Sequence, residues 1–309
     1  MESTMKIPNL SLSSLSVLCA PPRTLREPLP PDLPLGLPLH PSPQNPVPSS
    51  SLDVTARISL SINVYPKIQT LVELIRKASH CTALTGAGVS TLSGIRDFRG
   101  KNGLYNDADA DKIFDIAYFE EDPSIYYKAS ASFIYSIDEK EPSVVHNALA
   151  LLEQKGFLKS IITQNIDMLH QKAGSKNVIE IHGSPVFHYC LRCPGIRMPF
   201  EEAAAIVKAR EMPRCPNCEK VLKPAITFFG ENLPVNALRD ATAEAQDSDL
   251  MLVLGTSLTV HPAASMPSYC LRNGGGIVIV NNMPTPLDRQ AILHFDELEE
   301  VFTELSAVI

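Results

Sequence analysis

Apolar residues recur at two different spacings along the chain, and the two spacings alternate. In residues 66–79 the apolar side chains lie three or four positions apart, which predicts an amphipathic helix. The segment Cys81–Thr85 then predicts a short buried strand. By the same criteria we expect further strands at Leu158–Thr163, Val178–Ile181, Leu250–Gly255 and Ile277–Asn281, and helices at Val144–Gln154, Val235–Gln246 and Pro262–Arg272.

This alternation of strands and helices predicts an α/β fold, with a Rossmann-like parallel sheet and helices on both of its faces. Two segments interrupt the alternation, at residues 100–145 and at residues 185–229. We expect these two insertions to form a smaller lobe over the sheet. In such folds ligands bind beyond the carboxyl ends of the strands, which is where this chain carries its polar motifs.

The N-terminal part of the chain differs in composition from the rest. Residues 1–50 contain twelve prolines together with many serines and leucines, and proline at this density blocks helices and removes backbone donors. We therefore expect a disordered Pro/Ser-rich extension at residues 1–61 and a folded domain at residues 62–309. The mildly apolar segment Leu10–Ala20 is interrupted by serines, so we do not interpret it as a signal peptide.

Charge and hydropathy argue against two classes of function. The net charge is −7, and all of it belongs to residues 64–309, because residues 1–63 carry four basic and four acidic side chains. The chain has no long basic run, so we expect no direct binding of nucleic acid. No apolar stretch approaches the length of a membrane span, so we expect no membrane segment.

The seven cysteines include two closely spaced pairs. Cys190 and Cys193 form one C-x2-C motif, Cys215 and Cys218 form a second, and 21 residues separate the two motifs. The odd total argues against a disulfide scaffold and favours a reducing compartment. Unrelated cysteines or a redox pair are alternatives, but two such motifs at this spacing favour a zinc ribbon in the smaller lobe. Because four protein ligands fill a tetrahedral site, the predicted Zn²⁺ is structural.

A glycine motif follows the first predicted strand. Gly86-Ala87-Gly88 resembles half of a dinucleotide-binding fingerprint, although Thr91 stands in place of the third glycine. Taken alone, the motif fits a tight strand–helix turn equally well. It continues, however, through Ser90 into the Gly94–Arg99 sequence GIRDFR. A carboxylate, an aromatic ring and a guanidinium in succession favour a loop that meets a ligand.

Further polar motifs follow the later strands, and together they resemble a known family. They are the TQNIDMLH run at residues 163–170, Ile181-His182-Gly183, the GTSL run at residues 255–258, and Asn281. The TQNID, HG and GTSL elements, together with the glycine motif, the GIRDFR run at residues 94–99, the paired cysteines and the FGE run at residues 229–231, resemble the sirtuin family of NAD-dependent protein deacylases. The resemblance covers about Tyr65 to Leu305, and its seven elements occur in the family's order.

The resemblance implies a binding site for NAD. Phe98 would cover the reactive ribose face, Asn165 would hold the nicotinamide ribose and an ordered water, and Asp167 would bind the nicotinamide carboxamide. The full set of residues implied to bind the cofactor is Gly86, Ala87, Gly88, Ser90, Asp97, Phe98, Arg99, Gln164, Asn165, Ile166, Asp167, Gly255, Thr256, Ser257 and Asn281.

The implied chemistry also needs a general base. Cleavage of the nicotinamide–ribose bond leaves positive charge on the sugar, the acyl oxygen attacks there, and a ribose hydroxyl must then lose a proton. A histidine that titrates near neutrality suits that role. His182 matches the family's base, ends a strand and precedes a glycine, so we expect it to be catalytic together with Asn165. We interpret the following histidines as structural: His146, His170, His188, His261 and His294.

The segment Lys223–Pro234 resembles the family's binding segment for the acyl-lysine peptide, which would pair with it by strand addition. Ile226 and Phe229 would wall the tunnel for the lysine stem and the acyl group, next to Gly230 and Glu231. A return strand from the zinc module is the structural alternative, and both interpretations can hold together.

Two positions depart from the family's usual residues. Arg96 stands where most members carry proline, and Thr227 stands where an aliphatic residue is common. Neither change removes a catalytic group. No Tyr-x-x-Arg pair follows Arg99 to hold an acidic acyl chain, so we expect short neutral acyl groups to be preferred.

The resemblance therefore predicts an enzyme that uses NAD to remove acetyl groups from protein lysines and produces nicotinamide and O-acetyl-ADP-ribose. Its expected partners are proteins with acylated lysines. A mono-ADP-ribosyltransferase and a noncatalytic NAD-sensing scaffold are alternatives, although an intact His182 argues against a scaffold. The missing third glycine disfavours an ordinary Rossmann dehydrogenase. We expect a cytoplasmic location, with the nucleus as the alternative.

Overall fold

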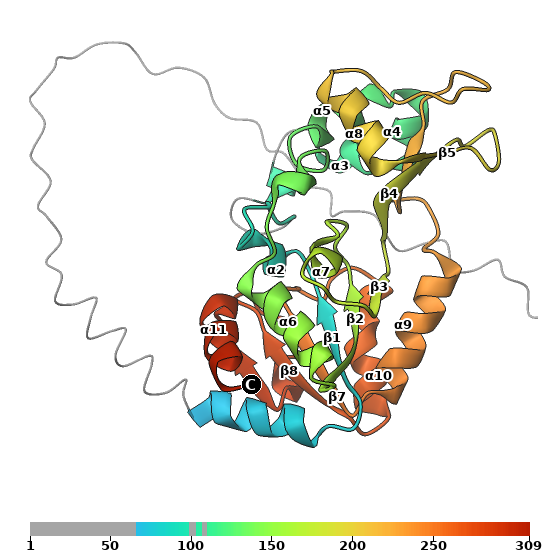
Figure 1. Cartoon of the computed structure of the whole chain (residues 1–309). Helices are drawn as coiled ribbons and strands as arrows, with labels where there is room; N and C mark the ends of the chain where they lie inside the picture. Colours follow the sequence, from blue (N-terminus) through green and yellow to red (C-terminus); the bar gives the residue numbers. More distant parts are fainter. Residues whose placement is uncertain (1–65, 99–102, 107–109) are drawn as a thin grey trace, which may run out of the picture. The chain divides into compact units, whose positions relative to one another are not determined.

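The structure of the chain is a computed structural model that describes residues 66–98, 103–106 and 110–309. Within these residues, six strands form one sheet in the order β3-β2-β1-β7-β8-β9, and each neighbouring pair is parallel (Figure 1). The strands are β1 (Cys81–Thr85), β2 (Leu158–Thr163), β3 (Val178–Glu180), β7 (Leu250–Leu254), β8 (Gly276–Val280) and β9 (Leu293–Phe295).

The predicted Rossmann-like sheet is thereby confirmed, and the five predicted strands lie within one residue of their expected ends. The edge strand β9 was not predicted, because its three residues are too few to show a period. The predicted extension at residues 1–61 lies outside the described residues.

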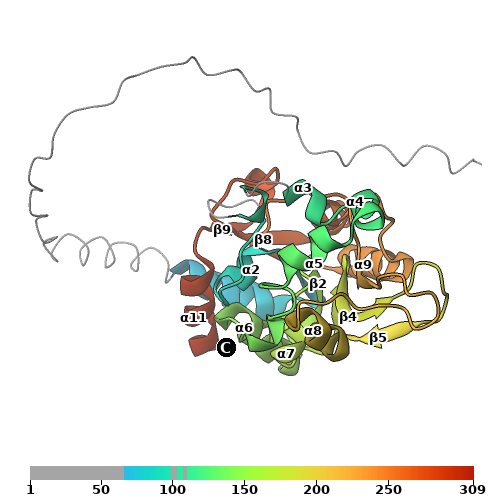
Figure 2. The ribbon, with the colours of Figure 1, turned by 90° about the horizontal axis from the view of Figure 1, so that it is seen from above.

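Helices cover both faces of the sheet because successive strand residues point to opposite faces. On β7, Leu250 and Leu252 belong to one hydrophobic layer, whereas Met251 and Val253 belong to the other. Each such fully buried side chain stabilises the fold by about 1.5–3 kcal/mol. The first layer contains the helix at residues 66–77, α6 (Val144–Gln154) and α11 (Leu298–Val308), and the second contains α9 (Val235–Asp247) and α10 (Met266–Arg272) (Figures 1 and 2).

The two insertions form a smaller lobe with its own antiparallel sheet and aromatic core. Phe228 lies at the centre of this core, with its ring centroid 5.2 Å from that of Tyr126 and 5.8 Å from that of Phe114. The lobe contains β4 (Gly183–Tyr189), β5 (Arg197–Pro199), β6 (Lys223–Ile226), α3 (Ala110–Ile113), α4 (Ile116–Glu121), α5 (Ser124–Ser130), α8 (Phe200–Lys208), η1 (Leu104–Asn106) and η2 (Ile137–Glu139). The short elements α2 (Gly88–Thr91), α7 (Leu169–Lys172), η3 (Ala263–Ser265) and η4 (Asp288–Gln290) connect strands of the main sheet.

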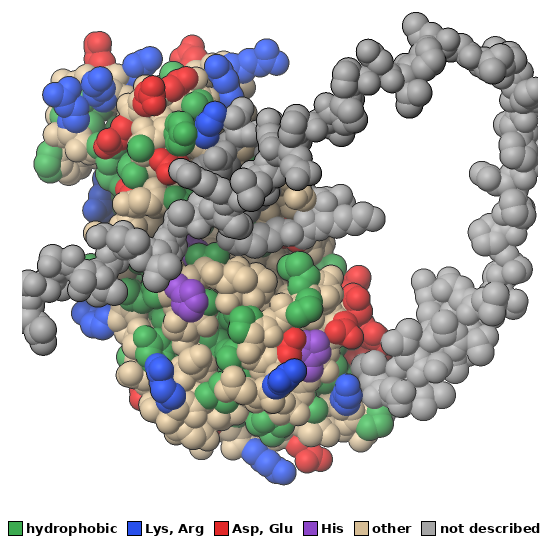
Figure 3. Space-filling view, turned by 180° about the vertical axis from the view of Figure 1, so that it is seen from behind, with side chains coloured by type: hydrophobic (Ala, Val, Ile, Leu, Met, Phe, Trp, Pro, Cys, Tyr) green, Lys and Arg blue, Asp and Glu red, His purple; other side chains and the backbone are tan. Residues whose placement is uncertain are grey.

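Helix length and surface charge add two observations to this fold. No helix within the described residues is both long and apolar enough to cross a membrane. On the face shown in Figure 3, basic and acidic side chains are interspersed over the smaller lobe rather than gathered by sign.

Two backbone turns touch at the carboxyl edge of the sheet, and glycine makes this contact possible. Gly255 follows β7 with a φ of +60°, and a Cβ atom there would lie 2.7 Å from the backbone nitrogen of Val89. A Cβ atom on Gly88 would lie 2.7 Å from Cα of Gly255. The loop after β1 therefore packs directly against the loop after β7.

We expect Gly255→Ala to lower the free energy of unfolding by about 2–5 kcal/mol, because it adds a backbone overlap to the cost of a left-handed alanine. Gly156→Ala is the matched control, since Gly156 also has a positive φ (+79°) but has no atom within 4 Å of the added Cβ. Urea unfolding of both variants tests this, and equal losses at the two positions would contradict it.

Candidate active site

The predicted cofactor residues meet where β1 and β2 end. The side-chain amide of Asn165 donates to the carbonyl oxygen of Gly86 (3.0 Å) and to Oγ of Ser90 (3.1 Å). The Ser90 hydroxyl in turn donates to Oδ2 of Asp167 at 2.6 Å. All three polar side chains are buried. Ser90 therefore joins the glycine motif to the loop that carries Asn165 and Asp167.

Asp167 is a buried carboxyl group in a defined orientation. Burial raises its pKa, while hydrogen bonds from Ser90 and from the backbone nitrogen of Leu169 act in the opposite direction. Its Oδ1 accepts from Leu169 at 3.0 Å and its Oδ2 accepts from Ser90. Since a carboxylate has about four acceptor positions, the group retains capacity to accept from a ligand's amide.

The loops after β7 and β8 lie beside this network. Nε2 of Gln164 donates to Oγ1 of Thr256 at 2.9 Å, which connects the loop after β2 to the loop after β7. The backbone nitrogen of Gly255 donates to the carbonyl oxygen of Val280, so Asn281 follows at the same edge. Asn281 is buried and donates to the carbonyl oxygen of Met283, whereas Ser257 is half-buried and its hydroxyl lies 3.1 Å from that of Thr259.

His182 lies at the junction of the sheet and the smaller lobe, and its neighbours determine its tautomer. Nδ1 lies 2.9 Å from the carbonyl oxygen of Gln164. A carbonyl oxygen only accepts, so the proton resides on Nδ1 and Nε2 carries a free lone pair. Desolvation lowers the pKa of the imidazole, and the hydrogen bond to Gln164 partly opposes this shift. The half-buried ring is thus suited to accept a proton at neutral pH.

The predicted apolar residues of the cofactor and substrate sites share one hydrophobic cluster. Phe98 and Ile166 pack against the aromatic core of the smaller lobe, as do Ile226 and Phe229. The ring of Phe98 meets that of Phe114 edge-on at 6.0 Å. The structure therefore brings these four side chains, called the apolar wall below, into one cluster. Asp97 is described as well, but Arg99 lies outside the described residues.

Three of the histidines interpreted as structural are buried away from solvent. Burial lowers the pKa of His146 to about 4, that of His170 to about 3 and that of His188 to about 4. All three rings are neutral at pH 7. Their hydrogen bonds run to Ser143, Thr85 and Tyr135 respectively, which ties them into the protein interior.

The four paired cysteines converge, as a tetrahedral metal site requires. Their sulfur atoms all lie within 4.8 Å of one another, and Sγ of Cys190 is 3.5 Å from Sγ of Cys218. The backbone nitrogens of Arg192 and Cys193 point at Sγ of Cys190. This donor set fits Zn²⁺. Because β4 separates it from His182 by seven residues, or about 20 Å, the metal has a structural role.

Comparison with known proteins identifies the family. The model of the Sir2 family matches residues 86–262. The chain belongs to the Sir2 family. The resemblance to sirtuins drawn from the motifs is confirmed. An NAD-dependent protein deacetylase of Thermotoga maritima is 42% identical over 230 residues, which cover 74% of this chain and 93% of the relative.

Solved structures of the Sir2 family share the fold as well. A Sir2 histidine-to-alanine variant with deacetylated p53 peptide and 3'-O-acetyl ADP ribose matches with a TM-score of 0.73 and 40% identity, covering 78% of this chain and 96% of that chain. A Sir2 bound to a propionylated peptide matches with a TM-score of 0.70 and 39% identity, covering 78% and 97% respectively.

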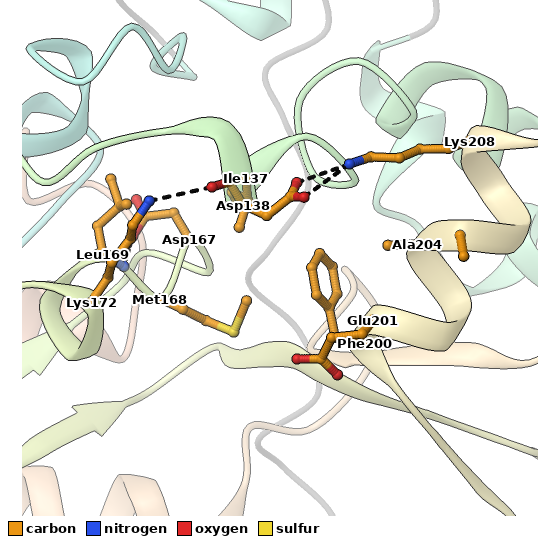
Figure 4. A pocket seen from close by; sticks show the side chains of 11 residues that line it. Ile137, Asp138, Asp167, Met168, Leu169, Lys172, Phe200, Glu201, Ala204 and Lys208 are labelled. Carbon is orange, nitrogen blue, oxygen red and sulfur yellow. Dashed lines mark hydrogen bonds and ion pairs between the residues drawn. The ribbon is translucent and has the colours of Figure 1, made fainter.

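A cavity of about 480 Å³, lined in part by Asp167, lies between α7 and the smaller lobe. Figure 4 shows two lysines pointing at the same acidic residue there. Lys172 donates to the carbonyl oxygen of Asp138 (3.3 Å), and Lys208 pairs with its carboxylate (2.9 Å). Both ammonium groups thus join α7 and α8 to η2.

Sequence reasoning missed the residues that connect the parts of the Sir2 site. The backbone nitrogen of Thr227 donates to the carbonyl oxygen of His182 at 2.8 Å. Lys223, which received no role, is fully buried beside Glu231. Met168 has a φ of 58°, a left-handed conformation that is uncommon without glycine. For Lys223, the available signal in the sequence was a lysine within an apolar strand pattern.

Removal of zinc should unfold the smaller lobe first, since the four cysteines and Leu222 form a separate small cluster there. We expect chelator-treated protein to lose NAD-dependent activity and to gain a lower-temperature melting transition, and Zn²⁺ but not Mg²⁺ to restore both. Metal content is measured by atomic absorption. Unchanged melting and activity at complete zinc removal would refute the assignment.

Proposed function

We propose that this chain removes acetyl and other short neutral acyl groups from protein lysines, with His182 as the general base. The broader activity follows from family membership: the protein is an NAD-dependent protein deacetylase or deacylase that produces O-acetyl-ADP-ribose. The observation that carries the proposal is the hydrogen bond from His182 Nδ1 to Gln164, because it leaves Nε2 as an acceptor beside the predicted cofactor residues.

The residues present suit an NAD molecule at the carboxyl edge of the sheet. When bound, NAD supplies a ribose carbon that releases nicotinamide and accepts the acyl oxygen. Gly86 and Gly88 would place the backbone after β1 next to the pyrophosphate, and their lack of a side chain lets this loop pack against Gly255. Asp167 and Ile166 would hold the carboxamide, and Asn165 would hold the ribose. The remaining contacts are proposed for Ala87, Ser90, Asp97, Phe98, Arg99, Gln164, Gly255, Thr256, Ser257 and Asn281.

His182 would take the proton of a ribose hydroxyl through Nε2. The Gln164 carbonyl supports this role in two ways: it orients the ring, and it stabilises the imidazolium that forms when Nε2 is protonated. Asn165 would act with it by positioning the sugar. Phe98 would exclude water from the reacting carbon, since its ring belongs to the apolar wall formed with Ile166.

An acyl-lysine peptide is the proposed substrate, bound along the segment from Ile226 to Glu231. Related Sir2 structures contain a deacetylated p53 peptide and a propionylated peptide, which supports the same substrate class here. Ile226 and Phe229 would enclose the lysine stem. Gly230 has a φ of +91°, which turns the chain directly after this wall.

The domain limits and the compartment are part of the same proposal. We assign the catalytic domain to residues 62–309, with small-lobe insertions at about 100–145 and 185–229 and with the Pro/Ser-rich extension outside it. We propose a cytoplasmic location, with the nucleus as the alternative, because in a reducing compartment paired cysteines serve as metal ligands more often than as disulfides. Within the described residues the cysteines are free thiols, which agrees with that requirement.

His182→Ala should reduce deacylation of an acetyl-peptide by at least about 100-fold, the usual contribution of a general base. The measurement is mass spectrometry of nicotinamide, O-acetyl-ADP-ribose and deacetylated peptide. Because desolvation lowers the pKa of His182 from 6.5, the base stays unprotonated at neutral pH, and kcat/KM falls only as the pH drops below 6.5.

His80→Ala is the control for this variant, since His80 pairs with Glu244 at 2.9 Å and precedes β1, at the opposite edge of the sheet. It should retain normal rates. Full activity of His182→Ala would refute the proposed base. Transfer of ADP-ribose to protein, without release of deacetylated peptide, would favour the mono-ADP-ribosyltransferase instead.

Short neutral acyl groups should react faster than acidic ones. The proposed tunnel wall contains Ile226 and Phe229, and burial of a carboxylate against such apolar side chains is costly without a paired cation. We expect kcat/KM for acetyl-lysine to exceed that for succinyl-lysine on the same peptide by at least about tenfold. Initial rates on acetyl, succinyl and long-chain acyl peptides test this, and a preference for succinyl-lysine would refute it.

A further inference from the structure

Lys223 of β6 is a lysine with no exposed side-chain surface. Its Nζ atom donates to the carbonyl oxygen of Ile226 at 2.6 Å and to that of Pro224 at 3.3 Å, and it pairs with Oε2 of Glu231 at 2.8 Å. The ring of Phe228 lies 4.1 Å from it, which adds a cation–π contact. A buried ammonium persists only with such complete pairing, and here the hydrogen-bond and ion-pair partners all belong to residues 224–231, while the Tyr189 ring of β4 adds a longer cation–π contact at 5.6 Å.

Glu231 completes a closed loop through the same oxygen atom. Its Oε2 also accepts a hydrogen bond from the backbone nitrogen of Phe228 at 2.7 Å. Lys223 and Glu231 therefore join the two ends of the segment that contains Ile226 and Phe229. Because this carboxylate oxygen is directed at Lys223, the role of Glu231 is to fix the conformation of the segment.

The same segment connects the two halves of the active site. At Thr227, its backbone nitrogen donates to the carbonyl oxygen of His182 at 2.8 Å. Two residues later, Phe229 exchanges backbone hydrogen bonds with Phe114 (2.7 Å) and Ile116 (3.1 Å) of the smaller lobe. The backbone conformation of residues 226–231 thus determines the position of Ile226 and Phe229 relative to the imidazole of His182.

We propose that Lys223 and Glu231 form a buried ionic clasp that positions residues 226–231 for the acyl-lysine peptide. This inference rests on the proposed function and assigns both residues as positioning residues, which act through the segment and not by contact with the reacting atoms. The described hydrogen bonds of the cofactor network join Gly86, Ser90, Asn165 and Asp167 without involving the clasp. Loss of the clasp should therefore weaken peptide binding and spare NAD binding.

The test compares Lys223→Met, Glu231→Gln and the double variant with the unaltered full chain. Methionine keeps the length of the side chain without its charge, and glutamine retains an acceptor for Phe228 without the ion pair. The control is Lys208→Met, which removes an ion pair with Asp138 at the surface of the same lobe. Nicotinamide release is measured against acetyl-peptide at saturating NAD, and against NAD at saturating peptide. Thermal melting is recorded for each protein.

Each single variant should raise the KM for acetyl-peptide by about ten- to a hundredfold, the effect of losing one buried charged hydrogen bond, and should change the KM for NAD by less than about threefold. The double variant should be no worse than the poorer single variant, because both changes remove one interaction. Lys208→Met should leave both KM values unchanged.

Three results would overturn the clasp: an unchanged peptide KM, a parallel rise of both KM values, or multiplicative effects in the double variant. If Lys223→Met does not fold, Glu231→Gln decides alone. Glu231 is 21% exposed, and after its exchange the buried ammonium of Lys223 still donates to the carbonyl oxygen of Ile226. Failure of the proposed function is distinct, because the unaltered chain would then release no deacetylated peptide and no O-acetyl-ADP-ribose from acetyl-peptide and NAD.

Discussion

The level at which the parallel strands end controls where the proposed cofactor residues that follow those strands lie. Thr85 of β1 pairs with Thr163 of β2 and with Leu254 of β7, and Leu254 pairs with Val280 of β8. The residue after each strand therefore begins a loop at one common edge. A shift of one residue would turn each strand's buried side chains to the opposite face. The two hydrophobic layers thus enforce the alignment that assembles the site.

The polar atoms at this edge form hydrogen bonds with one another. Their burial therefore carries little desolvation cost even when no ligand is bound. Ser90 accepts from Asn165 and donates to Asp167, and Asn165 also reaches the backbone of Gly86. A buried polar group without a partner costs about 1–3 kcal/mol. The network removes that cost and at the same time fixes the side chains in position, so little reorganisation is needed when a ligand binds.

Local pattern predicted the features that arise from local causes. The buried strands of the main sheet show as apolar runs, and the convergence of Cys190, Cys193, Cys215 and Cys218 follows from two tight turns that each supply two sulfurs. Helix α11 and strand β9 were not predicted from the sequence. Strand β9 has only three residues and gains its partner only when β8 is in place. The clasp of Lys223 and Glu231 was also missed, because sequence shows a charge but not its burial.

His182 stands where the cofactor side and the substrate side of the molecule meet. Its ring is oriented by the Gln164 carbonyl of the sheet, while its own carbonyl accepts from Thr227 of the smaller lobe. A base for this chemistry must reach a sugar held by one half while the acyl group arrives along the other. A histidine held by only one half would move with that half and would not respond to the position of the other. Because both backbones hold His182, any movement between the sheet and the lobe changes the orientation or the reach of the imidazole, so the two halves must be correctly placed before the proton can be transferred.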